Sequence, residues 1–300
     1  MKLPRGFLSI QLSSRHAKVL EKFLREEFTM YPRCKLVLPE QRIQEGFLLD
    51  NWIGVGIFTL DKQLVGCCIS KPLGRLKVSQ EILPNSGIVD YFCVDHTYRK
   101  QGFASFLLHE LVNSTGKQGR LVHLFLKEGL PLWKLPPLYT SQYIYRKKML
   151  SNELKENLGS MGIGLRGAIQ TYTHADFLPL RKFIANLPYQ LSGDSELFSF
   201  NYRGHSVYLC ITNAHHRTVP EGHRIGELAW ILPQTAEVPL SIQVLAVETC
   251  IDCSKYEIVI MDKKIPHNFK NSWIQDAPFS WYIYNYNPGT FFTTKPFLII

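Results

Sequence analysis

The sequence predicts a mixed α/β protein, an α+β fold with a mixed sheet, built from two lobes of similar architecture. Three observations support this prediction. The first half orders its patterns as two helices, a pair of strands and a strand–helix–strand unit. The second half repeats that general order, and a glycine-rich stretch without periodicity, 154–167, separates the halves. We therefore predict lobes at 1–158 and 159–300, although individual residues do not repeat.

The elements of the first lobe follow from the spacing of apolar residues. Helical spacing or strand-like apolar runs predict helices at 13–28 and 39–49, strands at 52–60, 64–70 and 88–94, a helix at 104–114 and a strand at 122–127. Residues 61–63, Asp-Lys-Gln, join the first two strands as a hairpin. Residues 84–87, Pro-Asn-Ser-Gly, predict a turn before the third strand.

The second lobe shows the same kinds of pattern. They predict a helix at 174–186, strands at 197–201, 206–212 and 224–232, a helix at 240–250, and strands at 257–261 and 279–286. The halves also end alike, in the aromatic runs 143–145 and 281–284. This likeness indicates a duplicated architecture.

Composition indicates an ordered intracellular protein. Hydrophobic residues form 45% of the chain and charged residues 20%, which is typical of a folded domain. The sequence has no apolar run of the roughly 18 residues that a membrane-spanning helix needs. Its first apolar stretch is too short for a secretory signal. The seven cysteines are odd in number and most lie in apolar runs, so we expect reduced thiols and a cytoplasmic location.

One segment carries a recognisable chemical pattern. An apolar strand ending at Val94 runs into a short basic loop, and residues 102–105, Gly-Phe-Ala-Ser, open a helix. The first amides of a helix, with the helix dipole behind them, attract phosphate groups. Gly102 permits close backbone approach and Ala104 is small. The pattern Arg99-x-x-Gly102-x-Ala104 therefore predicts a pyrophosphate-binding loop. The alternative is a plain strand–turn–helix.

This pattern resembles the coenzyme A pyrophosphate motif of the GCN5-related N-acetyltransferase (GNAT) superfamily. The surrounding sequence is similar to one branch of it, the glycylpeptide N-tetradecanoyltransferases, or N-myristoyltransferases. Five segments carry the likeness, in the order in which the family has them. Each is given with the family's own sequence in parentheses: 3–7 (Leu-Pro-x-Gly-Phe), 90–94 (Asn-Phe-Leu-Cys-Val), 99–105 (Arg-Ser-Lys-Arg-Leu-Ala-Pro), 141–146 (Cys-Arg-Tyr-Trp-His-Arg) and 281–286 (Tyr-Tyr-Leu-Tyr-Asn-Trp). It covers nearly the whole chain.

The resemblance implies two GNAT-like lobes, the first binding acyl-CoA and the second helping to hold a peptide that begins with glycine. Myristoyl-CoA would be a co-substrate, and no cofactor would be permanently bound. The backbone N–H groups of Tyr91 and Phe92 would polarise the thioester carbonyl. The chain-terminal carboxylate, on Ile300, would deprotonate the glycine ammonium, although the apolar tail fits an edge strand equally well. The implied acyl-CoA contacts are Phe92, Val94, Arg99, Lys100, Gln101, Gly102, Phe103, Ala104 and Ser105.

Departures from the family lie mainly on the peptide side, and they leave three functions open. Residues 30–35 are basic where the family is acidic, Tyr145 replaces a histidine, and 275–278 replaces Gly-Asp-Gly. Before Leu3 the sequence has no counterpart of the family's Lys-Phe-Trp segment, and Gly102 fits the general acetyltransferase pattern better. The chain is therefore an N-myristoyltransferase-like enzyme, a short-chain N-acetyltransferase that uses acetyl-CoA, or a degenerate protein that binds acyl-CoA or a partner without turnover.

Other candidate sites are weaker. The pair Cys250 and Cys253 is a lone CxxC, and the histidines at 205, 215, 216 and 223 fall in a polar stretch that predicts a loop, so we expect no metal. The net charge of +9 suits nucleic acid or a polyanion such as coenzyme A. Because the basic clusters are short, we expect no nucleic-acid partner. We also expect a monomer.

Overall fold

The computed structural model describes residues 2–30, 34–78, 80–128, 132, 137–147, 168–172, 195–262, 274–284 and 297–299. The chain divides into two compact units, one formed by 1–140 with 279–300 and the other by 141–278. These units differ in extent from the predicted lobes 1–158 and 159–300. Strand pairing explains the difference, because 279–284 pair with a strand of the first unit and 143–147 with one of the second. The glycine-rich stretch lies outside the described residues.

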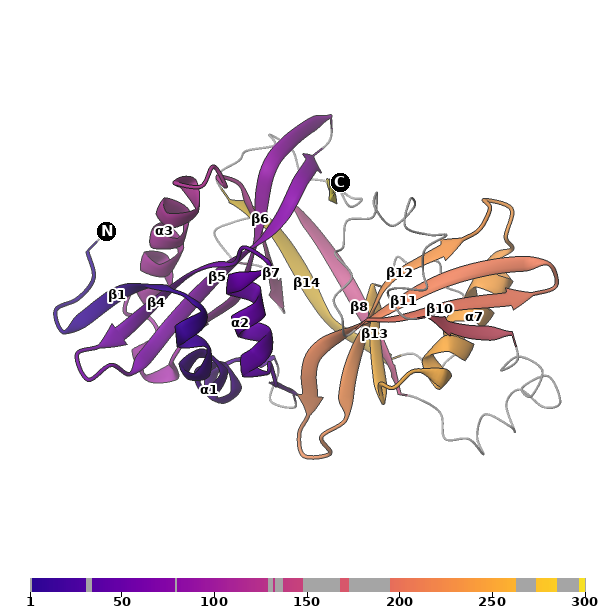
Figure 1. Ribbon diagram of the computed structural model, residues 1–300, viewed down its shortest axis with the longest axis horizontal. Coiled ribbons are helices and arrows are strands. Elements are labelled where there is room, and N and C mark those ends of the chain that lie inside the picture. Colours follow the sequence, from indigo (N-terminus) through magenta and orange to yellow (C-terminus); the bar gives the residue numbers. More distant parts are fainter. Residues whose placement is uncertain are drawn as a thin grey trace. The chain divides into compact units, whose positions relative to one another are not determined.

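The first unit contains a mixed sheet with one parallel pair (Figure 1). Its neighbouring strands are, in order, β1 (Phe7–Leu12), β4 (Ile53–Thr59), β5 (Leu64–Val78), β6 (Glu81–Val94), β7 (His123–Glu128) and the 279–284 part of β14 (Ile274–Tyr284). All neighbours are antiparallel except β6 and β7, which run parallel and are joined through α3 (Phe103–Gly116). Parallel strands cannot be joined by a tight turn, so the helix is the required crossover.

Helices cover both faces of this sheet. Successive residues of a strand point to opposite faces, and the pair Cys67 and Cys68 of β5 shows this. Cys67 packs in the cluster that contains α1 (Ala17–Glu27) and α2 (Glu40–Leu48), whereas Cys68 packs against α3. The predicted helices and strands of this half are therefore confirmed. Short elements supplement them: η1 (Ser14–His16), β2 (Thr29–Met30), β3 (Cys34–Leu36), η2 (His96–Tyr98) and β15 (Phe297–Ile299).

The predicted turn at 84–87 is wrong, because these residues lie inside β6. The register pairs Leu83 with Leu76 and Ser86 with Gly74, so two residues of β6 oppose one of β5. Proline and asparagine fill this bulge, where a missing N–H is tolerated and Asn85 takes a φ of 51°. Turn-forming residues here bend a long hairpin instead of ending it.

A buried polar cluster fastens β5, β6 and β7 together. Arg120 donates from Nη1 to the Ser70 carbonyl (3.1 Å) and hydroxyl (3.2 Å), and His123 Nε2 lies 3.1 Å from the same hydroxyl. Gly87 leaves room for the cluster, since a Cβ there would lie 2.6 Å from Ser70 Oγ. Burial, with the nearby Arg120 charge, lowers the pKa of His123 from 6.5 to about 4. The histidine is therefore neutral in the folded protein near neutral pH.

The second unit repeats the topology of the first. Its strands β9 (Ile169–Tyr172), β10 (Glu196–Tyr202), β11 (His205–Thr218) and β12 (Arg224–Pro233) are antiparallel neighbours, and β12 runs parallel to β13 (Ile258–Asp262). The crossover is α7 (Leu240–Cys253), which packs on the sheet. β13 then pairs with 143–147 of β8 (Tyr139–Lys147). The duplicated architecture is confirmed for the described elements, whereas the predicted helix at 174–186 lies outside them.

The histidine-rich stretch of this unit is a strand and not the predicted loop. His215 and His216 lie in β11, at a register shift between Asn213 and His216. His215 takes a φ of 54°, as the extra residue of a bulge can. The polar residues that indicated a loop therefore build an irregular strand.

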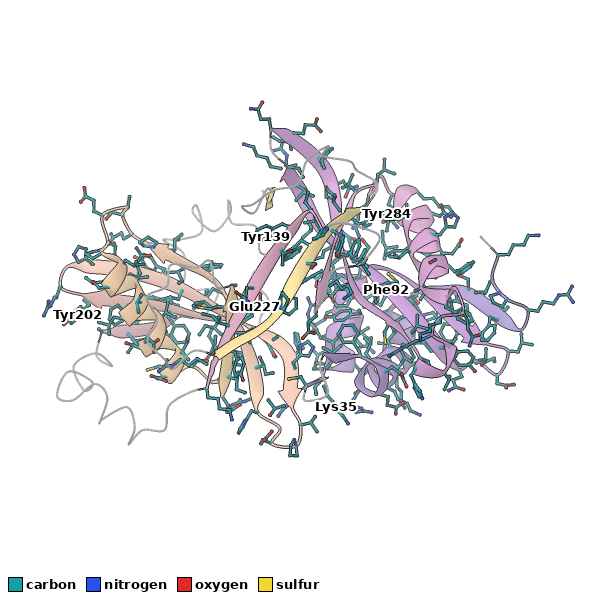
Figure 2. All side chains as sticks on the ribbon, turned by 180° about the vertical axis from the view of Figure 1, so that it is seen from behind. Lys35, Phe92, Tyr139, Tyr202, Glu227 and Tyr284 are labelled. Carbon is teal, nitrogen blue, oxygen red and sulfur yellow. The ribbon has the colours of Figure 1, made fainter. Side chains whose placement is uncertain are left out.

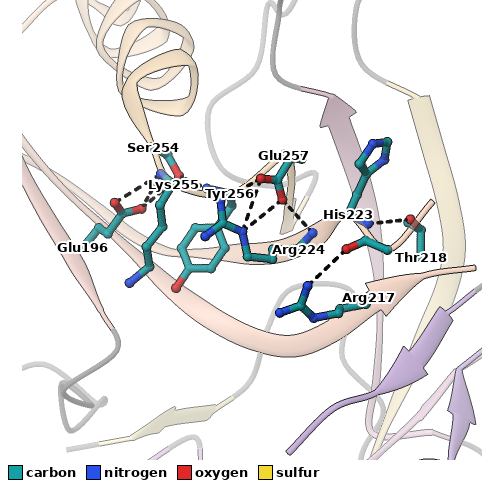
Figure 3. Close-up of polar contacts among 10 residues, drawn as sticks. Glu196, Arg217, Thr218, His223, Arg224, Ser254, Lys255, Tyr256 and Glu257 are labelled. Atoms are coloured by element: carbon teal, nitrogen blue, oxygen red, sulfur yellow. Dashed lines mark hydrogen bonds and ion pairs between the residues drawn. The ribbon is translucent and has the colours of Figure 1, made fainter.

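Two arginine pairs of the second unit differ sharply in burial. Arg146 of β8 contacts Asp252 (3.1 Å) and Glu248 (2.8 Å) of α7, with the Arg146 and Asp252 side chains only 2% and 3% exposed. Arg224 pairs with Glu257 at 2.7 Å, but these side chains are 45% and 38% exposed (Figure 3). The buried pair ties α7 to the sheet, whereas water screens the exposed pair.

In the described part of the chain, no helix has the length and apolar character to cross a membrane.

The contrast between the arginines is testable. We expect Arg146→Ala to lower the free energy of unfolding by about 3–5 kcal/mol, because it leaves the Asp252 carboxylate buried without its cation. The matched variant Arg224→Ala should cost at most about 1 kcal/mol. Urea unfolding followed by tryptophan fluorescence measures both. Equal losses from the two variants would contradict the assignment.

His123 should make stability depend on pH. Its pKa is about 4 in the folded chain and returns to about 6.5 on unfolding, so the unfolded chain binds more protons between these values. The free energy of unfolding is therefore highest above pH 6.5, and it falls by roughly 3 kcal/mol in all as the pH is lowered toward 4. His123→Gln should flatten urea-derived stability across this window, whereas His109→Gln on the exposed side of α3 should not.

Candidate functional site

The end of β6 carries a second bulge, at the residues predicted to hold the thioester. The register pairs Cys67 with Cys93 and Ile69 with Asp90, so Tyr91 and Phe92 together oppose one residue of β5. Tyr91 has a φ of 47°, in the left-handed region, which costs a bulky residue about 1–3 kcal/mol. Bulges that retain such strain are common beside active sites, where they redirect backbone groups.

The pairing of β6 with β7 ends just before this bulge. The parallel register covers Gly87 to Val89 of β6, although both strands continue beyond it. The bulge residues then divide between the two faces of the sheet. Tyr91 packs on the side of α1 and α2, whereas Phe92 is half-buried on the side of α3. Phe92 is labelled in Figure 2. The backbone of Phe92 therefore lies beside the stretch where β6 is no longer paired with β7.

The two amides predicted to polarise a carbonyl differ in their surroundings. The Tyr91 N–H donates to Oδ1 of Asp90 at 2.7 Å. The other oxygen of that carboxylate accepts from the Lys71 ammonium, which also donates to the Tyr91 hydroxyl at 2.9 Å. Sequence reasoning missed Lys71 altogether. Only pairing between strands 20 residues apart brings Lys71 to this bulge, so no local signal could have found it.

The loop after β6 is shaped by its own side chains. Asp95 accepts from the backbone N–H of Thr97 and so begins η2. Arg99 turns back along the loop and donates from Nε to the Val94 carbonyl at 2.9 Å, yet its side chain remains 54% exposed. Gln101 donates to the Thr97 carbonyl. Nη2 of Arg99 also lies 4.0 Å from Oε2 of Glu27, so the loop is ordered while α1 balances part of the Arg99 charge.

The loop ends at the start of α3 on Gly102. This glycine is the N-cap residue and has a φ of 87°, in the left-handed region that glycine adopts without strain. It offers no side-chain oxygen to the first N–H groups of the helix, which have no partners within the helix itself. Ala104 and Ser105 are exposed beside it, whereas Phe103 is buried. Such a helix start favours an anion.

Aromatic packing holds this helix start in place. The ring of Phe103 lies 4.9 Å from that of Phe7 and 6.0 Å from that of Tyr98, and Phe7 and Tyr98 also meet edge to face. Phe103 can therefore offer a ligand only its backbone. The structure brings the predicted contacts from Phe92 to Ser105 together as one strand end, one loop and one helix start. Ile300, the predicted base, lies outside the described residues.

One group of possible metal ligands occurs in the described part of the chain. Single ligand atoms of Glu27, Asp95 and His96 lie within 4.8 Å of one another. These groups already bind each other and the loop, since Glu27 accepts from the His96 backbone N–H at 3.1 Å and Asp95 caps η2. Their arrangement is accounted for by the anchoring of the loop to α1.

Known proteins resemble this chain in structure, whereas comparisons of its sequence found no match. No family model matches the chain, and no curated protein sequence matches it. The N-myristoyltransferase of Saccharomyces cerevisiae with bound myristoyl-CoA superposes on 99% of this chain and 85% of its own, with a TM-score of 0.64 at 12% identity. A structure of that enzyme with myristoyl-CoA and inhibitors covers 96% and 82%, with a TM-score of 0.67 at 11% identity.

A GCN5-related N-acetyltransferase from Anabaena variabilis is also similar, over 92% of this chain and 72% of its own, with a TM-score of 0.51 at 12% identity. The chain has a GNAT-like fold. The predicted fold class is therefore confirmed. The bulge of β6 and the start of α3 both belong to the first unit of this fold.

Proposed function

We propose that this protein is an acyl-CoA-dependent N-acyltransferase. One observation carries the proposal: a single segment, 90–105, joins a strained bulge to a glycine-started helix, just where the pairing of β6 and β7 ends. The helix start suits the pyrophosphate of coenzyme A. The bulge suits the thioester carbonyl, because it turns backbone N–H groups out of the ladder. The GNAT-like fold of the chain supports the same activity.

The reaction would join an amine to the acyl carbon. The amine reaches the site as an ammonium and gives one proton to a base, after which its nitrogen attacks the thioester carbonyl. The C–N bond forms, the C–S bond breaks, and the second proton leaves with the coenzyme A thiol. A backbone N–H directed at the carbonyl oxygen stabilises the negative charge that develops there. Arg99, whose side chain is 54% exposed although Nη2 lies 4.0 Å from Glu27, would add positive charge beside the phosphates.

The finer proposal is that the acyl group is myristoyl and the acceptor is an N-terminal glycine. Two observations support it. Five segments resemble the N-myristoyltransferases in family order. The fold also matches that of the yeast N-myristoyltransferase solved with myristoyl-CoA over nearly the whole chain. The altered peptide-side segments favour a second candidate, a protein that binds acyl-CoA without turnover, and acetyl-CoA remains the alternative donor.

The terminal carboxylate of Ile300 is the proposed base. β15 pairs with β5 in a register that places Ile299 opposite Leu76, as an edge-strand reading of the tail would have it. Leu76 is seven residues along β5 from Ile69, which stands opposite Asp90. At about 3.3 Å per residue, this separation is roughly 23 Å along the strand. The register shifts of this hairpin bend the strand, so the direct distance is shorter than this length.

Calorimetry with three ligands tests the proposed function. We expect myristoyl-CoA to bind more tightly than acetyl-CoA or free coenzyme A, because a long acyl chain adds apolar contact. Adding a peptide that begins with glycine should then release free thiol, measured with a thiol reagent, whereas the same peptide with an acetylated N-terminus should not. Binding without release supports the non-catalytic candidate. Failure to bind any of the three ligands contradicts both.

Deletion of 298–300 tests the terminal carboxylate. We expect kcat to fall by about 100-fold or more, in the range lost with a general base, while the affinity for myristoyl-CoA is kept. Unchanged turnover after the deletion would exclude this carboxylate as the base.

A charge placed at the start of α3 tests the phosphate site. Ala104→Asp adds a carboxylate where it suits the helix dipole, so we expect an unchanged or slightly higher melting temperature. The same carboxylate repels an anion, so the affinity for coenzyme A should fall about tenfold or more at low salt. Asn113→Asp makes the same charge change on an exposed residue near the far end of α3 and should leave the affinity unchanged. Equal affinity in both variants would place the phosphates elsewhere.

A further inference from the structure

Four groups close a ring around the bulge of β6. Asp90 accepts from the Tyr91 backbone N–H with one carboxylate oxygen and from the Lys71 ammonium with the other. Lys71 also donates to the Tyr91 hydroxyl, so the ring starts at the Tyr91 amide and closes at the Tyr91 phenol. Tyr91 is therefore held at both ends, at its amide and at its phenol, by one lysine–aspartate pair.

Aromatic faces complete the surroundings of Lys71. Its ammonium lies 4.1 Å from the ring centre of Tyr91 and 4.8 Å from that of Trp52. Both positions are favourable for a cation over an aromatic face. Trp52 in turn fills the space above Gly46, where a Cβ would approach its ring to 2.3 Å. The position of the ammonium is thus fixed by the residue just before β4 together with β5 and β6.

The ring keeps one charge pattern near neutral pH. Burial disfavours the charged form of Lys71, but the adjacent Asp90 carboxylate outweighs this and raises the pKa of Lys71 above its usual range. Burial also raises the pKa of the Tyr91 phenol, and the nearby Lys71 charge, which lowers that pKa, offsets the effect of burial only in part. Lys71 is therefore an ammonium and Tyr91 a neutral phenol. A protonated Lys71 is not itself a nucleophile, which excludes it as an acyl acceptor in this arrangement.

The Lys71–Asp90 pair is half-buried, with side-chain exposures between those of the Arg146–Asp252 and Arg224–Glu257 pairs. The Lys71 and Asp90 side chains are 24% and 37% exposed, so water partly screens their attraction and the pair adds less to global stability than a fully buried pair whose partner would be left unpaired. What the ring does hold is the left-handed φ of Tyr91, which a bulky residue does not keep by itself. Since the Tyr91 dihedral angles set the plane of the next peptide, they set the direction of the Phe92 N–H.

We propose that Asp90 and Lys71 are positioning residues, which hold Tyr91 in its left-handed conformation so that the Phe92 N–H points at the acyl carbonyl. In this arrangement the Tyr91 N–H is taken by Asp90, so Phe92 supplies the donor from the bulge. The inference rests on the proposed acyl transfer and deepens it, because it assigns the donor from the bulge to Phe92 alone and adds a side-chain ring that directs it.

Three variants test the ring in the full-length protein. Asp90→Ala removes both contacts, Asp90→Asn keeps an oxygen for the Tyr91 amide but loses the charge, and Lys71→Met removes the ammonium. We expect kcat for acyl transfer to fall about 10- to 100-fold in Asp90→Ala, as for a donor displaced by about an ångström. Asp90→Asn should lose less. The KM for acyl-CoA should stay within about twofold, because the pyrophosphate site is untouched.

A spectroscopic measurement separates positioning from general damage. Infrared difference spectra of bound acyl-CoA, labelled with ¹³C at the thioester carbonyl, report how strongly that carbonyl is hydrogen-bonded. The carbonyl band should move in Asp90→Ala toward its frequency in free acyl-CoA, with the affinity unchanged. The double variant of Asp90→Asn with Lys71→Met should lose no more kcat than the worse single variant, since both act through one ring. Asp61→Asn and Lys18→Met make matched charge changes at exposed positions outside the site and should change nothing.

The outcomes distinguish this inference from the proposed function. If the wild-type protein binds no acyl-CoA, the proposed function fails and this inference with it. If the wild-type protein transfers the acyl group but Asp90→Ala keeps its kcat within twofold, only the positioning role is overturned. A fall in kcat with an unmoved carbonyl band also overturns it. A graded loss of kcat in the order Asp90→Ala then Asp90→Asn, with a moved band, supports it.

Discussion

The parallel pairing of β6 and β7 is the constraint on which the candidate site depends. Parallel neighbours need a crossover, so the chain must leave the end of β6, return along one face through α3 and enter β7 in the same direction. This route places the first turn of α3 beside the carboxyl end of β6. Because the pairing stops at Val89, the strand end and the helix start can offer backbone groups to one ligand.

The second unit repeats this topology without the residues that mark the candidate site. β12, α7 and β13 repeat the parallel pair and its crossover. The connection before α7, residues 234–239, carries neither glycine nor a basic residue, and it contains the exposed acid Glu237. Its helix is capped by Pro239, with a φ of −56°. A duplicated fold has therefore kept the scaffold twice, but only the first unit combines a glycine at the helix start with positive charge.

Charge in the two units serves different ends. The buried Arg146 guanidinium contacts the Asp252 carboxylate, which water does not reach, and so joins α7 to its sheet. Losing it would destabilise the fold because the carboxylate would stay buried without a partner. The Lys71–Asp90 pair remains in contact with water and stands next to a strained backbone. Water partly screens such a half-buried pair, and its proposed effect is local, on the direction of one peptide plane. The buried Arg146–Asp252 pair thus has a structural role, whereas the half-buried Lys71–Asp90 pair has the proposed positioning role.

The sequence by itself determined the fold class, the α-helices and many of the strands of the described ranges, and the segment 90–105 as the candidate site. These features depend on local order: apolar periodicity sets the elements, and a glycine after a basic loop marks a helix that starts without a side-chain cap. Only the tertiary structure decided that residues 84–87 form a bulge, that 279–284 return to the first unit, and that Lys71 reaches Tyr91. Each of these depends on which strands become neighbours and in which register, and pairing between distant strands leaves no signal within a local window of sequence.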